Sequence, residues 1–112
     1  MTYISQTDVA ITLATAASII DTQGWTVGTF GHHTDGPCCA YRAISRAAGD
    51  SKALCNDTVV AFEKHLRETT PEGTHRATAF DQIVYWNDHL AADATQVVAT
   101  LNDAASTLIG TP

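Results

Sequence analysis

Hydrophobic residues recur near the start of the chain at the three- and four-residue intervals that place side chains on one face of a helix. Over residues 7–23 the positions of this stripe are Val9, Leu13, Ala16, Ala17 and Ile20. Thr7 or Ser5 can cap the start of the helix, and the carboxylate of Asp8 suits its positive end. Gly24 follows the last helical residue and is placed to end the helix. We therefore predict a first helix over residues 7–23.

A proline and a run of small residues mark a second helix. Pro37 suits the first turn of a helix because its ring fixes the φ angle that a helix requires, and Gly49 is placed to end it. The apolar positions between them are mostly small: Cys38, Cys39, Ala40, Ala43, Ile44, Ala47 and Ala48. Small side chains let a helix approach its neighbours closely. We therefore predict that this helix starts at Pro37 and lies at the centre of the fold.

Three more helices are predicted in the second half of the chain. The helix over residues 56–68 has an apolar face formed by Cys55, Val59, Phe62 and Leu66. The helix over residues 78–86 buries Phe80, Ile83 and Val84. The last helix begins with a capping box between Asp93 and Gln96, continues to Ile109 and ends at Gly110. Its core positions are Val97, Leu101, Ala104 and Leu108.

Residues 25–31 combine β-branched and aromatic side chains with glycine, so we predict a short extended segment or hairpin there. Residues 32–37 are rich in residues that favour turns. The chain has 112 residues, which is the size of one ordinary domain. Together these patterns predict a mostly α fold, a compact bundle of about five helices that forms a single domain over residues 1–112.

The overall charge and hydropathy limit the classes of partner. The net charge of −6 opposes nonspecific binding to nucleic acid and to anionic membranes. The apolar stretch Val9–Ile20 is too short to span a bilayer, and the first residues lack the basic region of a signal peptide. We therefore expect a soluble, acidic, cytoplasmic protein, or one in the host cytoplasm if it is phage-encoded. Nucleic acid and membranes are not expected as partners.

Cysteine and histidine, the usual ligands of zinc, lie near one another in the middle of the chain: His32, His33, Cys38, Cys39 and Cys55. Zinc needs four tetrahedral ligands, which commonly come from CxxC or HxxxH pairs that share a face. Neither spacing occurs here, and adjacent cysteines on a helix would point about 100° apart. We therefore expect no metal and no cofactor, with the cysteines acting as reduced, small core residues.

Cys38 has one candidate chemical role. It directly follows Pro37, so the positive end of the predicted helix would favour its thiolate. A nucleophilic thiol also needs a histidine base within hydrogen-bonding distance. The five candidates are His32, His33, His65, His75 and His89. A small enzyme based on Cys38 therefore stays open as an alternative.

The two tryptophans stand in short motifs, Gly24-Trp25-Thr26-Val27-Gly28 and Ile83-Val84-Tyr85-Trp86-Asn87-Asp88. A structural interpretation predicts that Trp25 and Trp86 are largely buried and join the exit of the first helix to the fourth helix. Asn87 would then end that helix in the left-handed conformation, and Asp88 would cap the next turn. A functional interpretation places a binding cluster at a pocket rim, formed by Trp25, Trp86, Asn87, Asp88 and His89.

The order of the motifs GWTxG, DGPxCA and IxxWND, followed by a final helix, resembles a family of small uncharacterised proteins. These proteins occur in actinobacteria and their phages and are catalogued as a domain of unknown function. The resemblance extends from Leu13 to Ala105. Tyr41 and Arg42 depart from the pattern, which has a small residue such as glycine there, and this weakens the expectation of close helix packing. The resemblance brings no known activity, so no catalytic residue follows from it.

The sequence leaves three classes of function open. The preferred one is a small non-enzymatic protein-interaction module that acts on a host or phage protein if the chain is phage-encoded. One alternative is a small enzyme using Cys38 or the Asn87/Asp88/His89 cluster. The other is a structural homo-oligomer. Local signatures of large enzyme classes, such as a phosphate loop, a nucleophile elbow or HExxH, do not occur in the sequence.

Overall fold

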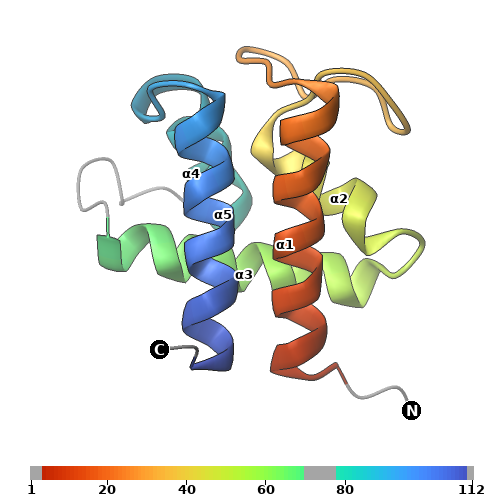
Figure 1. Ribbon diagram of the computed structural model, residues 1–112, viewed down its shortest axis with the longest axis vertical. Helices are drawn as coiled ribbons and strands as arrows, with labels where there is room; N and C mark the ends of the chain where they lie inside the picture. The colour runs from red at the N-terminus through yellow and green to blue at the C-terminus, as the bar shows by residue number, and fades with distance from the viewer. Residues whose placement is uncertain (1–3, 70–77, 111–112) are drawn as a thin grey trace.

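The computed structural model describes residues 4–69 and 78–110. These residues form the α-helices α1 (Gln6–Gln23), α2 (Ala40–Ala48), α3 (Lys52–Thr69), α4 (Ala79–Tyr85) and α5 (Ala94–Ile109), with a π-helical turn η1 (Trp86–Leu90) directly after α4. Helices α1 and α5 lie side by side and run in opposite directions, and α3 crosses behind them (Figure 1). The prediction of a mostly α bundle of five helices is confirmed.

Helices α1 and α5 match their predicted boundaries closely because both carry strong local capping signals. Of the two candidate caps of α1, the structure uses Ser5, whose hydroxyl accepts from the backbone N–H of Asp8 at 3.1 Å. The Asp8 carboxylate accepts in return from the backbone N–H of Ser5. Asp93 caps α5 by accepting from the backbone N–H of Gln96 at 2.8 Å. Gly110 ends α5, as predicted, and it does so in the left-handed conformation.

Helix α2 begins at Ala40, so the prediction that it starts at Pro37 is wrong. The backbone N–H of Cys38 donates to the carbonyl of Gly24, and the carbonyl of Cys38 accepts from the N–H of Thr26, both at 3.2 Å. Because these bonds hold Cys38 in an extended conformation, the chain cannot turn into a helix before Cys39. Cys39 is the N-cap, and its sulfur accepts from the backbone N–H of Arg42.

The predicted extended segment near residues 25–31 forms two isolated β-bridges, and no strand occurs in the described residues. Trp25 pairs with Cys38 in parallel, and Gly31 pairs with Cys38 in antiparallel orientation. Gly31 has a φ of 89°, and a Cβ atom there would collide with the carbonyl of Pro37 and lie 2.8 Å from Cys38 Cα. A glycine is therefore required where the two segments approach each other.

Helices α3 and α4 differ from the predictions at their ends. Helix α3 starts at Lys52, before the predicted residue 56, because the Ser51 hydroxyl accepts from the backbone N–H of Leu54 at 3.1 Å and stabilises an earlier first turn. Helix α4 starts after its cap Thr78. Phe80 and Val84 of α4 are only half-buried, contrary to the prediction, because they face the loop between α1 and α2 rather than the core.

The core lies between α1 and the other helices, and its largest fully buried side chains are Leu13, Ile20, Ile44, Phe62, Leu66, Ile83, Trp86, Val97 and Leu101. Most of the predicted stripe positions are among the buried residues, while Cys55 and Leu108 are half-buried. Ala40 and Ala43 of α2 are buried despite the neighbouring Tyr41, since the Tyr41 ring packs on Phe80 instead. No helix in the described residues is long and apolar enough to cross a membrane.

Candidate functional site

The loop of residues 24–39, which joins α1 to α2, is held against η1 by the side chain of Asn87. The Oδ1 atom of Asn87 accepts from the indole Nε1 of Trp25 at 2.7 Å and from the backbone N–H of Ala40 at 3.0 Å. Its Nδ2 atom donates to the carbonyl of Thr26 at 3.1 Å and to Asp88 Oδ1 at 3.0 Å. Asn87 is fully buried, and these four bonds use the full capacity of its amide.

The predicted left-handed conformation of Asn87 does not occur. All residues with positive φ in the described ranges are glycines, and the chain continues past Trp86 as the π-helical turn. This turn ends where the backbone N–H of Ala91 donates to the carbonyl of Trp86 at 2.8 Å. Asn87 therefore does not stop the helix. It lies inside a helical turn of the wider kind that often occurs at functional sites.

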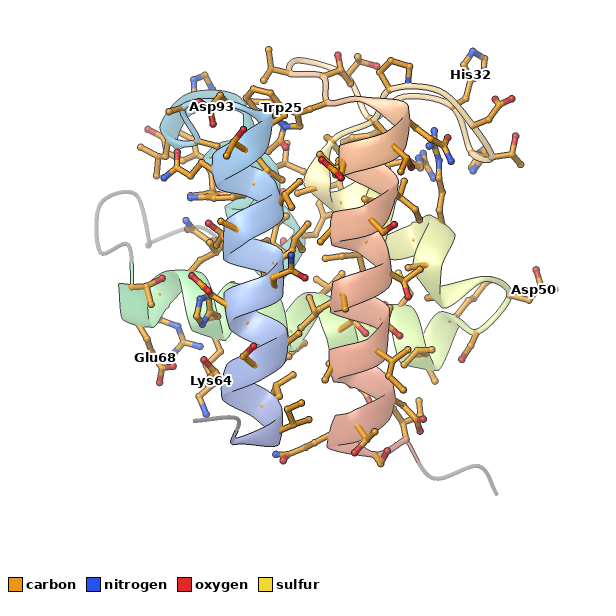
Figure 2. The ribbon with its side chains drawn as sticks, in the orientation of Figure 1. Trp25, His32, Asp50, Lys64, Glu68 and Asp93 are labelled. Atoms are coloured by element: carbon orange, nitrogen blue, oxygen red, sulfur yellow. The ribbon has the colours of Figure 1, made fainter. Side chains whose placement is uncertain are left out.

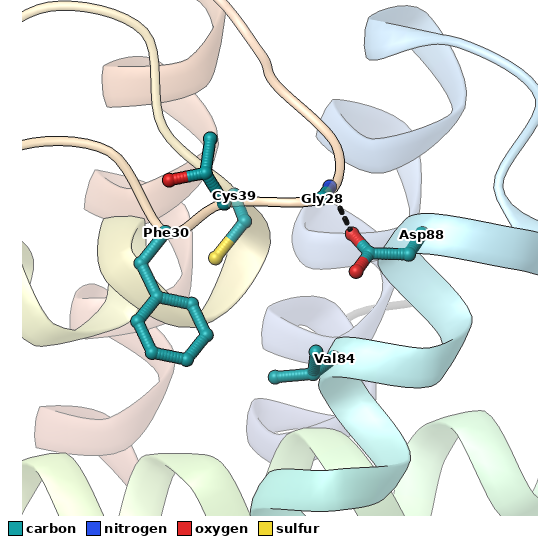
Figure 3. Close-up of a pocket in the computed structure, with 6 residues that line it drawn as sticks. Gly28, Phe30, Cys39, Val84 and Asp88 are labelled. Atoms are coloured by element: carbon teal, nitrogen blue, oxygen red, sulfur yellow. Dashed lines mark hydrogen bonds between the residues drawn. The ribbon is translucent and has the colours of Figure 1, made fainter.

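Asp88 is the second anchor of the same loop, rather than the cap of the following turn that the sequence predicted. Its Oδ1 atom accepts from the backbone N–H of Gly28 at 3.0 Å, as Figure 3 shows. The same oxygen accepts from Asn87 Nδ2. The other oxygen, Oδ2, has no hydrogen-bond partner in the part of the chain that the structure describes.

Arg46 of α2 fixes the far end of the loop, a role that the sequence did not indicate. Its guanidinium donates to the carbonyls of His32, Asp35 and Gly36 at 2.6–2.8 Å. It also donates to the Gln23 side chain at the end of α1. One side chain thus satisfies three backbone carbonyls that would otherwise have no helix or strand to bond. An arginine inside a predicted helix gives no local sign of such a role.

A pocket of about 310 Å³ lies between the loop and the α4–η1 segment (Figure 3). Its lining residues are Gly28, Thr29, Phe30, Cys39, Val84 and Asp88. The Phe30 ring is supported by Tyr41 and Phe80, with ring centroids 5.7 and 5.6 Å away. The volume is at the lower end of the range for small-molecule pockets, about 300–1,000 Å³.

The structure brings together only part of the predicted binding cluster. Trp25 is half-buried beside Asn87, and Asp88 lines the pocket. Trp86 is buried in the core, where its ring packs edge-on against Phe62 at 5.6 Å. His89 is exposed, and its ring lies 4.8 Å from the ring of Tyr85. Figure 2 shows Trp25 at the end of the molecule where α5 begins.

The cysteines occupy positions that disfavour a thiolate. Burial raises the pKa of the Cys38 thiol, against the opposing effect of the Arg46 guanidinium. Burial also raises the pKa of the Cys39 thiol, although backbone N–H groups nearby favour its ionised form. Because Cys38 precedes the N-cap of α2, the helix-end argument for its activation does not apply. No histidine hydrogen-bonds to either sulfur within the described ranges, and His75 lies outside them.

Within residues 4–69 and 78–110, no three side chains of histidine, cysteine, aspartate or glutamate gather as a metal site would require. The pocket lining offers the Asp88 carboxylate, the Cys39 thiol, the Thr29 hydroxyl and the apolar side chains of Phe30 and Val84. This arrangement can bind a group by contact and by hydrogen bonding.

Comparison with known proteins identifies one relationship. A family of unknown function, DUF6197, matches residues 4–107. Neither the curated proteins nor the solved structures contain a match to the chain. The matched range includes both tryptophan motifs, the whole loop and the pocket. The chain therefore belongs to the family of unknown function DUF6197.

Proposed function

We propose that the protein is a non-enzymatic protein-interaction module that binds its partner with the loop of residues 24–39 and the pocket beneath it. The observation that carries this proposal is the fixation of the loop by side chains from outside it. Asn87 and Asp88 hold one part, and Arg46 holds the other. Structureless connections longer than about 12–15 residues are uncommon in compact domains and usually functional.

The loop displays apolar side chains where a partner could reach them. Val27 is 49% exposed and Phe30 is 37% exposed, at the edge of the pocket. A partner that covers these side chains gains apolar burial, and a loop already held in place loses little conformational entropy on binding. Fixed aromatic side chains beside a pocket are typical of the residues that dominate binding energy at protein interfaces.

The geometry supports the interaction module better than it supports an enzyme that uses Cys38 or the Asn87/Asp88/His89 cluster. The Cys38 thiol is fully buried, and its pKa is raised by that burial. In the other cluster, Asn87 has no free hydrogen-bonding capacity, and His89 packs on Tyr85 outside the pocket lining. An acid–base or nucleophilic mechanism needs such groups within hydrogen-bonding reach of one another.

Self-association is a second candidate because the outer face of α1 and α5 exposes apolar residues. Ile11 is 60% exposed and Ile109 is 54% exposed, and both border a hollow between the two helices. Residues 9–20 of α1 include no charged side chain. Two copies, each of net charge −6, repel each other at long range, but no charged side chain lines this hollow to oppose the contact itself. Sedimentation equilibrium of wild type and Ile11→Ser tests this: a dimer lost in the variant supports it, and a monomeric wild type refutes it.

Affinity capture from a lysate of the source organism tests the interaction module. The bait variants are Val27→Ser and Phe30→Ser, with Val60→Ser as the control, since Val60 is 59% exposed on α3, outside the loop. We expect the same proteins to bind wild type and Val60→Ser and to be lost from both loop variants. Wild type, Val27→Ser and Val60→Ser should show similar melting temperatures, whereas Phe30→Ser should melt lower because it loses the ring contacts with Tyr41 and Phe80. Capture is therefore measured below the melting transition of every variant, and Val27→Ser decides the outcome. Captured proteins that bind the loop variants as strongly as wild type would refute the proposal.

A further inference from the structure

The pocket beside the loop contains one charged lining group, the carboxylate of Asp88. Its Oδ1 atom is committed to the backbone N–H of Gly28 and to Asn87 Nδ2. Its Oδ2 atom is without a hydrogen-bond partner in the described residues. Figure 3 shows Asp88 and Val84 on one side of the pocket and Phe30 and Cys39 on the other. The pocket thus combines one unused negative acceptor, Asp88 Oδ2, with the apolar side chains of Phe30 and Val84, and Thr29 adds a neutral hydroxyl.

Such a pocket favours a side chain with an apolar shaft and a positive head. The shaft can pack on Phe30 and Val84, as the methylene groups of long cationic side chains do on apolar surface. The head can donate to Asp88 Oδ2. The acidic chain, at net charge −6, also attracts a positively charged partner at long range.

The single free oxygen distinguishes between the two cationic side chains. A guanidinium binds a carboxylate best through two parallel bonds, one to each oxygen. Asp88 offers only Oδ2 because Oδ1 already accepts two hydrogen bonds. An ammonium is a compact point charge that needs only one such acceptor. Lysine therefore fits this carboxylate better than arginine.

We propose that the pocket receives a lysine side chain of the partner protein, with its ammonium donating to Asp88 Oδ2 and its methylene chain lying between Phe30 and Val84. This inference rests on the proposed interaction function and names the chemistry that the loop recognises. Arg42 lies 5.7 Å from the centroid of the Phe30 ring but does not line the pocket, so Asp88 determines the charge of the lining.

Titration of small probes into ¹⁵N-labelled protein tests the proposal through the amide signals of Gly28 and Thr29. The probes are Nα-acetyl-lysine methylamide, its Nε-acetyl derivative, the corresponding arginine compound and butylammonium. The decisive variant is Asp88→Asn, since its amide oxygen can still accept from Gly28 while its NH₂ group takes the place of Oδ2. The matched control is Asp103→Asn, which removes the same charge from an exposed position on α5.

We expect the lysine probe to shift these amides and to bind about three- to fivefold more weakly to Asp88→Asn, with no change in Asp103→Asn. Acetylation of the ammonium should weaken binding similarly. Equal binding of the acetylated probe, tighter binding of the arginine probe, or failure of all probes to shift Gly28 would overturn the proposal. Butylammonium binding more tightly than the lysine probe would do so as well, since it would indicate a small amine rather than a protein.

The result of the capture experiment is independent of the titration, because capture uses the Val27 and Phe30 variants and intact partner proteins rather than small probes. If capture depends on the loop but the lysine probe does not bind, the interaction module stands and the lysine assignment is wrong. If the lysine probe binds but capture ignores the loop, the pocket chemistry is correct and the proposed function is wrong.

Discussion

Replacement of Asn87 by alanine should destabilise the protein strongly, because one side chain makes several of the hydrogen bonds that hold the loop. The Trp25 indole N–H and the Thr26 carbonyl belong to half-buried residues and can turn to water, which costs about 1 kcal/mol each. The backbone N–H of Ala40 is on a fully buried residue, and leaving it unpaired costs about 1–3 kcal/mol. Together the loss is about 3–5 kcal/mol, a large part of a total stability of about 5–15 kcal/mol.

Urea denaturation followed by circular dichroism measures this loss, with Asn102→Ala at an exposed position of α5 as the control. The control should change the free energy of unfolding by less than about 0.5 kcal/mol. Trp25→Phe removes the indole donor and part of a ring that packs on the core, so its cost in the wild type includes the lost hydrogen bond and a packing term. In the Asn87→Ala background only the packing term remains, so the cost should be about 1 kcal/mol lower than in the wild type. A loss below about 1 kcal/mol for Asn87→Ala, or fully additive effects, would refute the network.

Three further predictions concern other parts of the same region. Trp86→Ala should cost about 3–5 kcal/mol because the ring is buried against Phe62, whereas Trp25→Ala should cost less because Trp25 is half-buried; reversed effects in urea denaturation would contradict this assignment. Arg46→Met should leave the far-UV helical signal unchanged while making the loop more sensitive to limited proteolysis, and unchanged cleavage would show that the guanidinium is not needed to fix the loop. Burial raises the pKa of the Cys38 thiol above its ordinary value of 9.0, so its contribution to stability is complete below that pH and is lost as pH rises through the raised pKa of the folded state. Between about pH 8 and pH 10 the melting temperature should therefore fall less in Cys38→Ala than in wild type. An equal decrease in the two proteins would show that ionisation of Cys38 does not cause the loss of stability.

The helices could be predicted from the sequence because their signals are local. The stripe from Val9 to Ile20 and the cap at Asp93 depend on residues within one or two turns of each other. The start of α2 could not be predicted in the same way. Pro37 is a good first residue of a helix on local grounds, but Cys38 is held in an extended conformation by backbone bonds to Gly24 and Thr26. A contact between distant segments therefore overrode a local preference.

The candidate site was harder to predict than the start of α2, because more of its contacts join residues that are far apart in the sequence. A pattern of asparagine after tryptophan at the end of a helical stretch favours a helix stop, yet Asn87 bonds to residues 25, 26 and 40. The motifs did indicate that Trp25, Asn87 and Asp88 belong together, and the structure places them in one network. Nothing local linked Arg46 to the loop or Cys39 and Val84 to the pocket. Those positions follow only from how α2 and α4 pack.

The neighbouring residues Asn87 and Asp88 have different roles: Asn87 stabilises the loop, and Asp88 is the residue proposed to recognise the partner. Asn87 is buried, neutral and fully bonded, so any change there lowers loop order and stability. Asp88 is partly exposed, and its two oxygens differ: Oδ1 anchors Gly28, while Oδ2 is free in the described structure. An amide at this position can still accept from Gly28 and Asn87 through its oxygen, although more weakly than a carboxylate. Asp88→Asn therefore keeps the anchor and removes the negative acceptor at Oδ2, so binding of a cationic probe should fall much more than stability.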